Sequence, residues 1–172
     1  KESEHDVWEA GHSSTSLSAA LGMAVARDLH GDDYAIVPII GDGALSSGMS
    51  MEALNQIGSE KRNMVIIFND NHMSISKNVG AMDLAFTKLR ASKSYNTLKS
   101  DVSDVLSQTK TGKNILEGMR HVKNALKENV VDTSIFGEFN LDYIGPVNGH
   151  DIDLLMKVLR IAKQHKGPIV VH

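Results

Sequence analysis

Two stretches of the sequence decide the fold: YAIVPIIGDG at residues 34–43 and MVIIFNDN at residues 64–71. Each begins with a short apolar run rich in β-branched residues, and each ends in a polar cluster, GDG in the first and NDN in the second. Continuous apolar runs are typical of strands that a parallel sheet covers on both faces. We therefore predict strands over 34–40 and 64–68, each followed by a polar turn at its carboxyl end. Pro38 departs from this pattern, because a proline cannot donate to a strand ladder and favours an edge or an irregularity.

The spacing of apolar residues elsewhere predicts helices between the strands. Helical periodicity favours helices over 17–29, 47–57 and 152–164, and further strands are expected at 141–144 and 169–171. The serines and threonines before the first helix are able to cap its first turn, and Gly31 is expected to end that helix in a left-handed conformation. Strands that alternate with helices in this way predict an α/β fold with a doubly wound, mostly parallel sheet.

Residues 81–135 differ from the rest of the chain, since Lys, Ser, Asn and Thr dominate there and few apolar residues fall in each turn. We interpret this segment as a helical excursion with mobile parts. No repeat or linker divides the sequence, so residues 1–172 are predicted to form a single domain. The chain stops directly after the apolar run GPIVVH, and for that reason we expect it to be a fragment of a longer protein.

Composition narrows the class of protein. The 172 residues are 41% hydrophobic, and 18 Lys and Arg against 21 Asp and Glu give a formal net charge of −3. This mild acidity argues against a nucleic-acid partner, which needs a basic face. No apolar run is long enough to cross a bilayer, so we expect no membrane association. The absence of cysteine excludes thiol catalysis, zinc-thiolate sites and iron–sulfur clusters, and it fits a reducing cytoplasm.

The two polar clusters follow neighbouring strands, and the carboxyl ends of parallel strands form the crevice in which ligands bind. Asp42 and Asn71, one strand-helix-strand unit apart, are placed to offer two side-chain oxygens to Mg²⁺, with a backbone carbonyl after Asn71 as a third ligand. Asn69 is the competing second ligand. A helix beginning near Ala44 would offer N–H groups to a phosphate held by the same metal. The alternative is structural, because GDG alone is a common turn and NDN can be an Asx-rich loop.

The pattern becomes specific in longer segments. GDG followed after about thirty residues by an Asn-containing turn resembles the thiamine-diphosphate enzymes. Nearly the whole chain is similar to the N-terminal domain of the 1-deoxy-D-xylulose-5-phosphate synthase family, a transketolase-like group. The segments that carry this resemblance are GHSSTSLSAALGMAVA, IIGDGALSSGMSMEALN, IFNDNHMSISKNVGAM and YIGPVNGHD. Generic transketolases do not share the loop NDNHMSIS.

The resemblance implies a site built around thiamine diphosphate and Mg²⁺. Asp42, Asn71 and the backbone carbonyl of Met73 would hold the metal, while the N–H groups of Gly43 and Ala44 would face the diphosphate. The remaining cofactor-binding residues implied are Gly41, His12, Ser13, Ser14, Ser74 and Ser76.

Some of these residues have a second interpretation. His12 is the single candidate for a catalytic role, through a hydrogen bond to the diphosphate or to a substrate oxygen, and the alternative is a structural histidine at a helix entrance. The serines at 74 and 76 could cap backbone groups instead of contacting phosphate. The segment NGHD resembles a DGHD motif of the wider transketolase family, with Asn148 in place of the usual Asp, so we expect Asn148 to shape a turn before the helix that follows.

The resemblance also implies an activity that these residues do not complete. The family condenses pyruvate with glyceraldehyde 3-phosphate and releases CO2, for isoprenoid, thiamine and pyridoxal precursors. Its members would be homodimers in the bacterial cytosol or plastid stroma. The Glu that contacts the aminopyrimidine ring lies in a second domain, so we expect this chain to be truncated at both ends and inactive alone. The alternatives are another thiamine-diphosphate enzyme, such as a transketolase or a 2-oxo-acid dehydrogenase component, or a non-catalytic phosphate-binding α/β domain.

Overall fold

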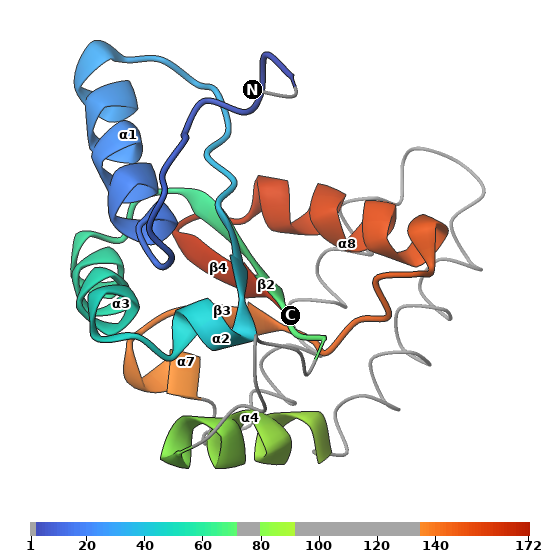
Figure 1. The fold of residues 1–172 in the computed structure, drawn as a ribbon. Helices are drawn as coiled ribbons and strands as arrows, with labels where there is room; N and C mark the ends of the chain where they lie inside the picture. The colour runs from blue at the N-terminus through green and yellow to red at the C-terminus, as the bar shows by residue number, and fades with distance from the viewer. Residues whose placement is uncertain (1–2, 72–79, 92–134) are drawn as a thin grey trace.

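The computed structural model describes residues 3–71, 80–91 and 135–172. These residues form a four-stranded parallel sheet in the order β1-β2-β4-β3, with helices on both faces (Figure 1). The strands are β1 (Ile39–Gly41), β2 (Met64–Asn69), β3 (Asp142–Ile144) and β4 (Pro168–Val171). The helices are α1 (Ser16–His30), α2 (Asp42–Leu45), α3 (Gly48–Glu60), α4 (Ala81–Ala91), α7 (Ile135–Glu138) and α8 (Ile152–Gln164). The doubly wound α/β fold predicted from the sequence is thereby confirmed.

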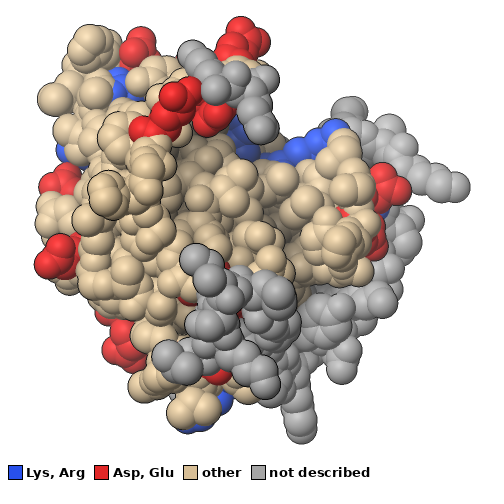
Figure 2. Space-filling model, viewed as in Figure 1, with Lys and Arg blue, Asp and Glu red and all other residues tan. Residues whose placement is uncertain are grey.

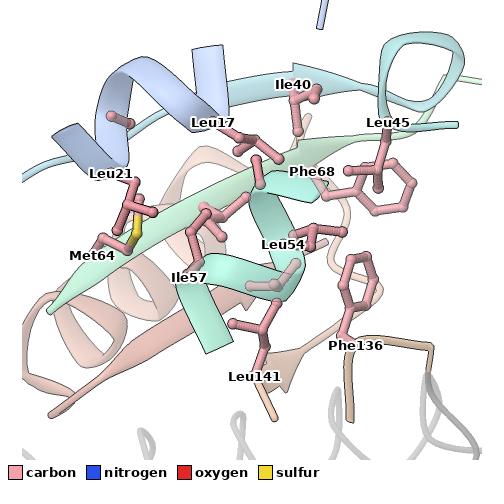
Figure 3. Close-up of a cluster of buried hydrophobic side chains, with 14 of the residues drawn as sticks. Leu17, Leu21, Ile40, Leu45, Leu54, Ile57, Met64, Phe68, Phe136 and Leu141 are labelled. Atoms are coloured by element: carbon pink, nitrogen blue, oxygen red, sulfur yellow. The ribbon is translucent and has the colours of Figure 1, made fainter. Parts of the chain in front are cut away.

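Side chains that alternate along the strands divide the core between the two faces of the sheet. On β2, Ile66 and Phe68 are buried with residues of α1, α3 and α4, whereas Val65 is buried on the opposite face with residues of α8. Val170, on the central strand β4, is fully buried in the larger cluster. Figure 3 shows this cluster, in which leucines and isoleucines of α1 and α3 meet the aromatic rings of Phe68 and Phe136. The continuous apolar run of β2 is therefore explained by burial on both faces.

Strand β1 is shorter and more exposed than we predicted. It begins at Ile39, although the carbonyls of Ile36 and Pro38 already accept hydrogen bonds from the N–H groups of β2, at 3.0 and 2.9 Å. Pro38 is tolerated because β1 is an outer strand of the described sheet. Val37 and Ile39 are 45% and 64% exposed, so the expectation of a strand covered on both faces is wrong here. In the space-filling view of Figure 2, much of the surface between α1 and α8 is tan, with acidic groups and a band of Lys and Arg toward its margins.

The helix ends follow the sequence only in part. Gly31 closes α1 with φ of 76°, as predicted. The predicted side-chain cap is wrong, because the hydroxyl of Thr15 donates to the carbonyl of His12 instead of accepting from the first turn. The residues after β1 form a separate short helix, α2, and Ser47 then caps α3 by accepting from the N–H of Ser50 at 3.3 Å. Helix α3 thus matches the helix predicted over 47–57, whereas the helix expected near Ala44 is the separate short α2, which already begins at Asp42.

The predicted excursion over 81–135 begins with α4, whose Phe86 and Leu89 are buried against the larger core cluster. Residues 92–134, which make up most of that excursion, lie outside the described residues. In the part of the chain that the structure describes, no helix has the length and apolar character needed to cross a membrane.

Candidate functional site at the carboxyl edge of the sheet

The helices that follow β2 and β3 pack on opposite faces of the sheet, and the change of face occurs at β4, an inner strand of the described sheet. Helix α4, which follows β2, packs on the face that carries α1 and α3, whereas α8, which follows β3, packs on the other face. Strand β4 lies between β2 and β3. In open parallel sheets, ligands bind outside the carboxyl ends of the strands at such a reversal. This edge of the molecule is therefore where the topology itself places a site.

Asp42 and Asn71 follow adjacent strand ends at this edge. The last pair of the β1–β2 ladder is Gly41 with Asn69, so the segments that follow these two strands leave the sheet side by side. Asp42 is 2% exposed, whereas Asn69 and Asn71 are both exposed. A buried carboxylate beside exposed amide oxygens matches the hard oxygen ligands that Mg²⁺ prefers. The structure thus brings together the ends that carry the predicted ligands, and both asparagines remain candidates for the second ligand.

Across residues 3–71, 80–91 and 135–172, no three His, Asp or Glu side chains are grouped so that they could hold a metal ion. The predicted donor set differs in kind, since it combines one carboxylate with amide and backbone oxygens. Met73, Ser74 and Ser76, which were predicted to contribute a metal ligand and two cofactor contacts, lie outside the described residues.

Two serine hydroxyls hold the short helix α2, which follows β1. Ser14, which is buried and has φ of 70°, donates to the carbonyl of Ala44 at 2.8 Å, and Ser50 donates to the same oxygen at 2.9 Å. These bonds join the GHSST segment to the GDGA turn, and they leave His12 and Ser13 exposed beside it. The proximity of the two motifs fits a shared site. Contact of His12, Ser13 or Ser14 with a cofactor stays a prediction.

Sequence reasoning missed three polar residues of this edge. The hydroxyl of Tyr143, on β3, lies 2.7 Å from Nδ1 of His172, and Nε2 of His172 lies 3.2 Å from a carboxylate oxygen of Asp70. The side chains of His172 and Asp70 are only 4% and 1% exposed. Burial of the phenol, and then the negative charge of Asp70, raise the pKa of Tyr143 above its ordinary value. Asp70 and His172 directly follow the carboxyl ends of β2 and β4, and Tyr143 lies one residue before the end of β3, so the signal used for β1 and β2 could have been applied to β3 and β4 as well.

The segment YIGPVNGHD packs closely against His172. The N–H of His172 donates to the carbonyl of Ile144 at 2.9 Å, and its carbonyl accepts from the N–H of Val147 at 2.7 Å. Gly145 has φ of 147°, and a Cβ placed there would lie 2.7 Å from both Cβ and the carbonyl oxygen of His172. The glycine is therefore required by close approach.

Asn148 shapes the turn before α8, as expected. Its side-chain oxygen accepts from the N–H of His150 at 3.0 Å, and its carbonyl accepts from the N–H of Asp151 at 3.1 Å. Asp151 then caps α8 by accepting from the N–H of Leu154 at 3.0 Å. The replacement of a carboxylate by an amide at 148 therefore leaves a working turn.

Comparison with known proteins places the chain in one family. A family model described as 1-deoxy-D-xylulose-5-phosphate synthase matches residues 1–172. Proteins named 1-deoxy-D-xylulose-5-phosphate synthase are similar to it in Macrococcus caseolyticus (54% identical over 171 residues), Geobacillus thermodenitrificans (51% over 172) and Clostridium botulinum (47% over 171). The matches cover 99% of this chain but only 27%, 27% and 28% of those relatives. The chain thus spans about a quarter of their length.

A solved structure supports the fold. The chain is similar to a putative thiamin diphosphate-dependent enzyme from Mycobacterium smegmatis, with a TM-score of 0.52 and 17% identity over 94% of this chain and 22% of that one. At this identity the similarity shows a common α/β architecture.

Proposed function

Because the chain belongs to the 1-deoxy-D-xylulose-5-phosphate synthase family, we propose that it is the part of a longer enzyme that binds Mg²⁺ and the diphosphate of thiamine diphosphate. The observation that carries the proposal is the pairing of Gly41 with Asn69, beyond which the buried carboxylate of Asp42 and the amide of Asn71 leave the sheet together. A single carboxylate with neutral oxygen donors leaves coordination positions on Mg²⁺ for phosphate oxygens and water.

In the proposed site, some residues would bind the metal and others would bind the diphosphate. Asp42, Asn71 and the backbone carbonyl of Met73 would hold the metal. Gly43 and Ala44 would present backbone N–H groups to the diphosphate, in a turn that the hydroxyls of Ser14 and Ser50 hold through the Ala44 carbonyl. When bound, thiamine diphosphate supplies a thiazolium carbon that adds to the carbonyl of a 2-oxo acid.

The proposed reaction of the whole enzyme condenses pyruvate with glyceraldehyde 3-phosphate and releases CO2. The proposed assembly is a homodimer, working in the cytosol or, in a plant, in the plastid stroma. The resulting sugar phosphate would feed isoprenoid, thiamine and pyridoxal precursors. What supports these finer statements is the family membership together with the oxygen-rich edge of the sheet.

Turnover by the full-length protein tests the proposal. With thiamine diphosphate and Mg²⁺, we expect CO2 release from pyruvate and a new sugar phosphate only when glyceraldehyde 3-phosphate is supplied as acceptor. Removal of the metal with EDTA should abolish both products, and excess Mg²⁺ should restore them. A two-carbon transfer from a ketose phosphate without CO2 release would indicate a transketolase instead. Lack of any cofactor-dependent turnover would favour a non-catalytic phosphate-binding domain.

The 172-residue chain is expected to show no turnover on its own under the same conditions. The physical reason is that none of the residues proposed here supplies the carboxylate that must act on the aminopyrimidine ring of the cofactor. Mass spectrometry of the reaction mixture checks this result, with the full-length protein as positive control. Product from the isolated chain above the no-protein background would contradict it.

A further inference from the structure

Three strands contribute to one chain of buried hydrogen bonds at the carboxyl edge. Tyr143 belongs to β3, His172 follows β4 and Asp70 follows β2, and the two bonds that join them measure 2.7 and 3.2 Å. Burying such polar groups costs free energy unless their hydrogen bonds are made. The side chain of Asp70 is 1% exposed, and its hydrogen bond with the His172 imidazole offsets the free-energy cost of burying its carboxylate.

The chemistry of the three side chains determines which group donates and which accepts in each of these hydrogen bonds. An ionised Asp70 can only accept, so the proton of the imidazole sits on Nε2 and points at the carboxylate. When the His172 ring is neutral, its Nδ1 accepts a hydrogen bond, and the hydroxyl of Tyr143, 2.7 Å away, is a donor for it. Burial and the charge of Asp70 raise the pKa of that hydroxyl, which keeps the donor protonated. In this tautomer the hydrogen bonds run from Tyr143 through His172 to Asp70.

His172 is held firmly on the side of β3. Its backbone makes hydrogen bonds with Ile144 and Val147, and its Cβ and carbonyl oxygen occupy the space next to Gly145. Its ring lies against the ring of Phe68, with centroids 4.6 Å apart. The imidazole therefore has a position set by backbone contacts that do not involve Asp70.

Asp70 lies where the sheet no longer holds the chain. The β2–β4 ladder ends with Ile67 and Val171, and the β1–β2 ladder ends with Gly41 and Asn69. Beyond these pairs, the bond from His172 fixes the side chain of Asp70 toward the interior. The next residue, Asn71, is exposed. The side-chain bond thus continues to fasten the segment from which the proposed metal ligand projects.

We propose that Tyr143, His172 and Asp70 are positioning residues that hold Asn71 opposite Asp42 and so raise the affinity for Mg²⁺ and the diphosphate. The inference rests on the proposed function. Outer-shell residues that orient metal ligands are typically worth about 10–100-fold in metal affinity. A hydrogen-bonded chain with one rigidly mounted member is able to supply this orientation.

The test measures cofactor binding by calorimetry in the full-length protein, titrating thiamine diphosphate at several Mg²⁺ concentrations. His172→Phe keeps a ring against Phe68 and removes both hydrogen bonds, and we expect the half-saturating Mg²⁺ concentration to rise about 10–100-fold. Asp70→Asn should raise it by only about threefold, because a neutral amide can donate to Nε2 while Nδ1–H donates to Tyr143, which preserves the geometry with the direction reversed. Tyr143→Phe removes one oxygen, and its effect should fall between these two; it also serves if His172→Phe does not fold.

The opposite edge of the same strands offers a matched control. His165 and Asp142 also form a histidine–aspartate pair at 2.7 Å, but at the amino ends of β4 and β3. His165→Phe should leave the Mg²⁺ requirement unchanged. The inference is overturned if His172→Phe and Tyr143→Phe lower the unfolding temperature but bind Mg²⁺ and cofactor like the unaltered protein. If the unaltered protein itself shows no magnesium-dependent binding, the proposed function fails and this inference fails with it.

Discussion

Replacing Gly58 by alanine is expected to destabilise the domain by about 3 kcal/mol or more. Overpacking a close contact costs roughly 1–3 kcal/mol. The hydrogen bond between Gly58 and the side chain of Asn140 would be lost as well. Gly58 is in α3, and a Cβ built there would lie 1.7 Å from the carbonyl oxygen of Phe139. The Gly58 carbonyl also accepts from the amide of Asn140 at 3.3 Å. The helix and the turn before β3 therefore touch backbone to backbone.

That turn cannot easily move away. The N–H of Leu141 donates to the carbonyl of Phe136 at 3.0 Å, and both side chains are in the core, at 4% and 0% exposure. Any shift that relieved the clash would pull these residues out of the larger cluster. The added methyl is thus expected to act on core packing as well as on one contact.

The measurement is thermal unfolding of the full-length protein, followed through the transition of this domain. We expect the midpoint to fall by about 6–12 °C, since 1 kcal/mol corresponds to roughly 2–4 °C for a domain of this size. Gly22→Ala is the control: Gly22 is an exposed residue inside α1, and a methyl group added there would meet nothing within 4 Å. That change should stabilise the protein by about 0.4–1 kcal/mol. Equal midpoints for the two variants would show that the contact at Gly58 relaxes freely.

Replacing Asp42 by alanine is expected to weaken magnesium-dependent binding of thiamine diphosphate by at least about 100-fold. Even outer-shell partners of metal ligands are worth about 10–100-fold, and Asp42 is proposed as a direct ligand and as the charged one. Asn71→Ala should have a similar but smaller effect, because it removes a neutral oxygen.

Calorimetry on the full-length protein checks this result and settles the choice of second ligand. If Asn69 were the ligand, Asn69→Ala and not Asn71→Ala would reduce the affinity. Asp33→Ala is the control, since Asp33 is exposed before β1, at the end of that strand remote from Asp42. Unchanged affinity in Asp42→Ala, with a folded protein, would remove the central support for the metal site.

How far the sequence could predict this molecule depends on how local each feature is. Strand β2 and helix α8 were predictable because an apolar run and a 3.6-residue period are properties of the segment itself. The bounds of β1 were not, since Val37 and Ile39 are apolar whether or not a neighbour covers them, and only the strand order shows that β1 is an outer strand.

The site divides in the same way. Asp42 and Asn71 follow consecutive strands, and consecutive parallel strands are often neighbours, so their approach could be inferred. The contact of Asp70 with His172 depends on β4 lying between β2 and β3, an order that no local pattern contains. In the sequence alone, Tyr143 and His172 therefore look like ordinary residues near the ends of apolar strands, and only the strand order shows that they meet. The close approach at Gly58 is hidden for the same reason, because its partner, Phe139, is distant in sequence.

The central place of β4 also governs the order in which the chain can fold. Met64 on β2 pairs with Pro168 on β4, across about a hundred intervening residues, whereas β1 and β2 are joined by a short helical connection. Closing so long a loop is entropically costly and slows a folding step that depends on it. During synthesis the first two strands and α3 can associate early, but the partner of β3 in the described sheet is β4, which is made after it. Until then the apolar residues that β4 will cover are exposed to other chains, so the time at which β4 is made sets how long this part of the nascent protein needs a chaperone.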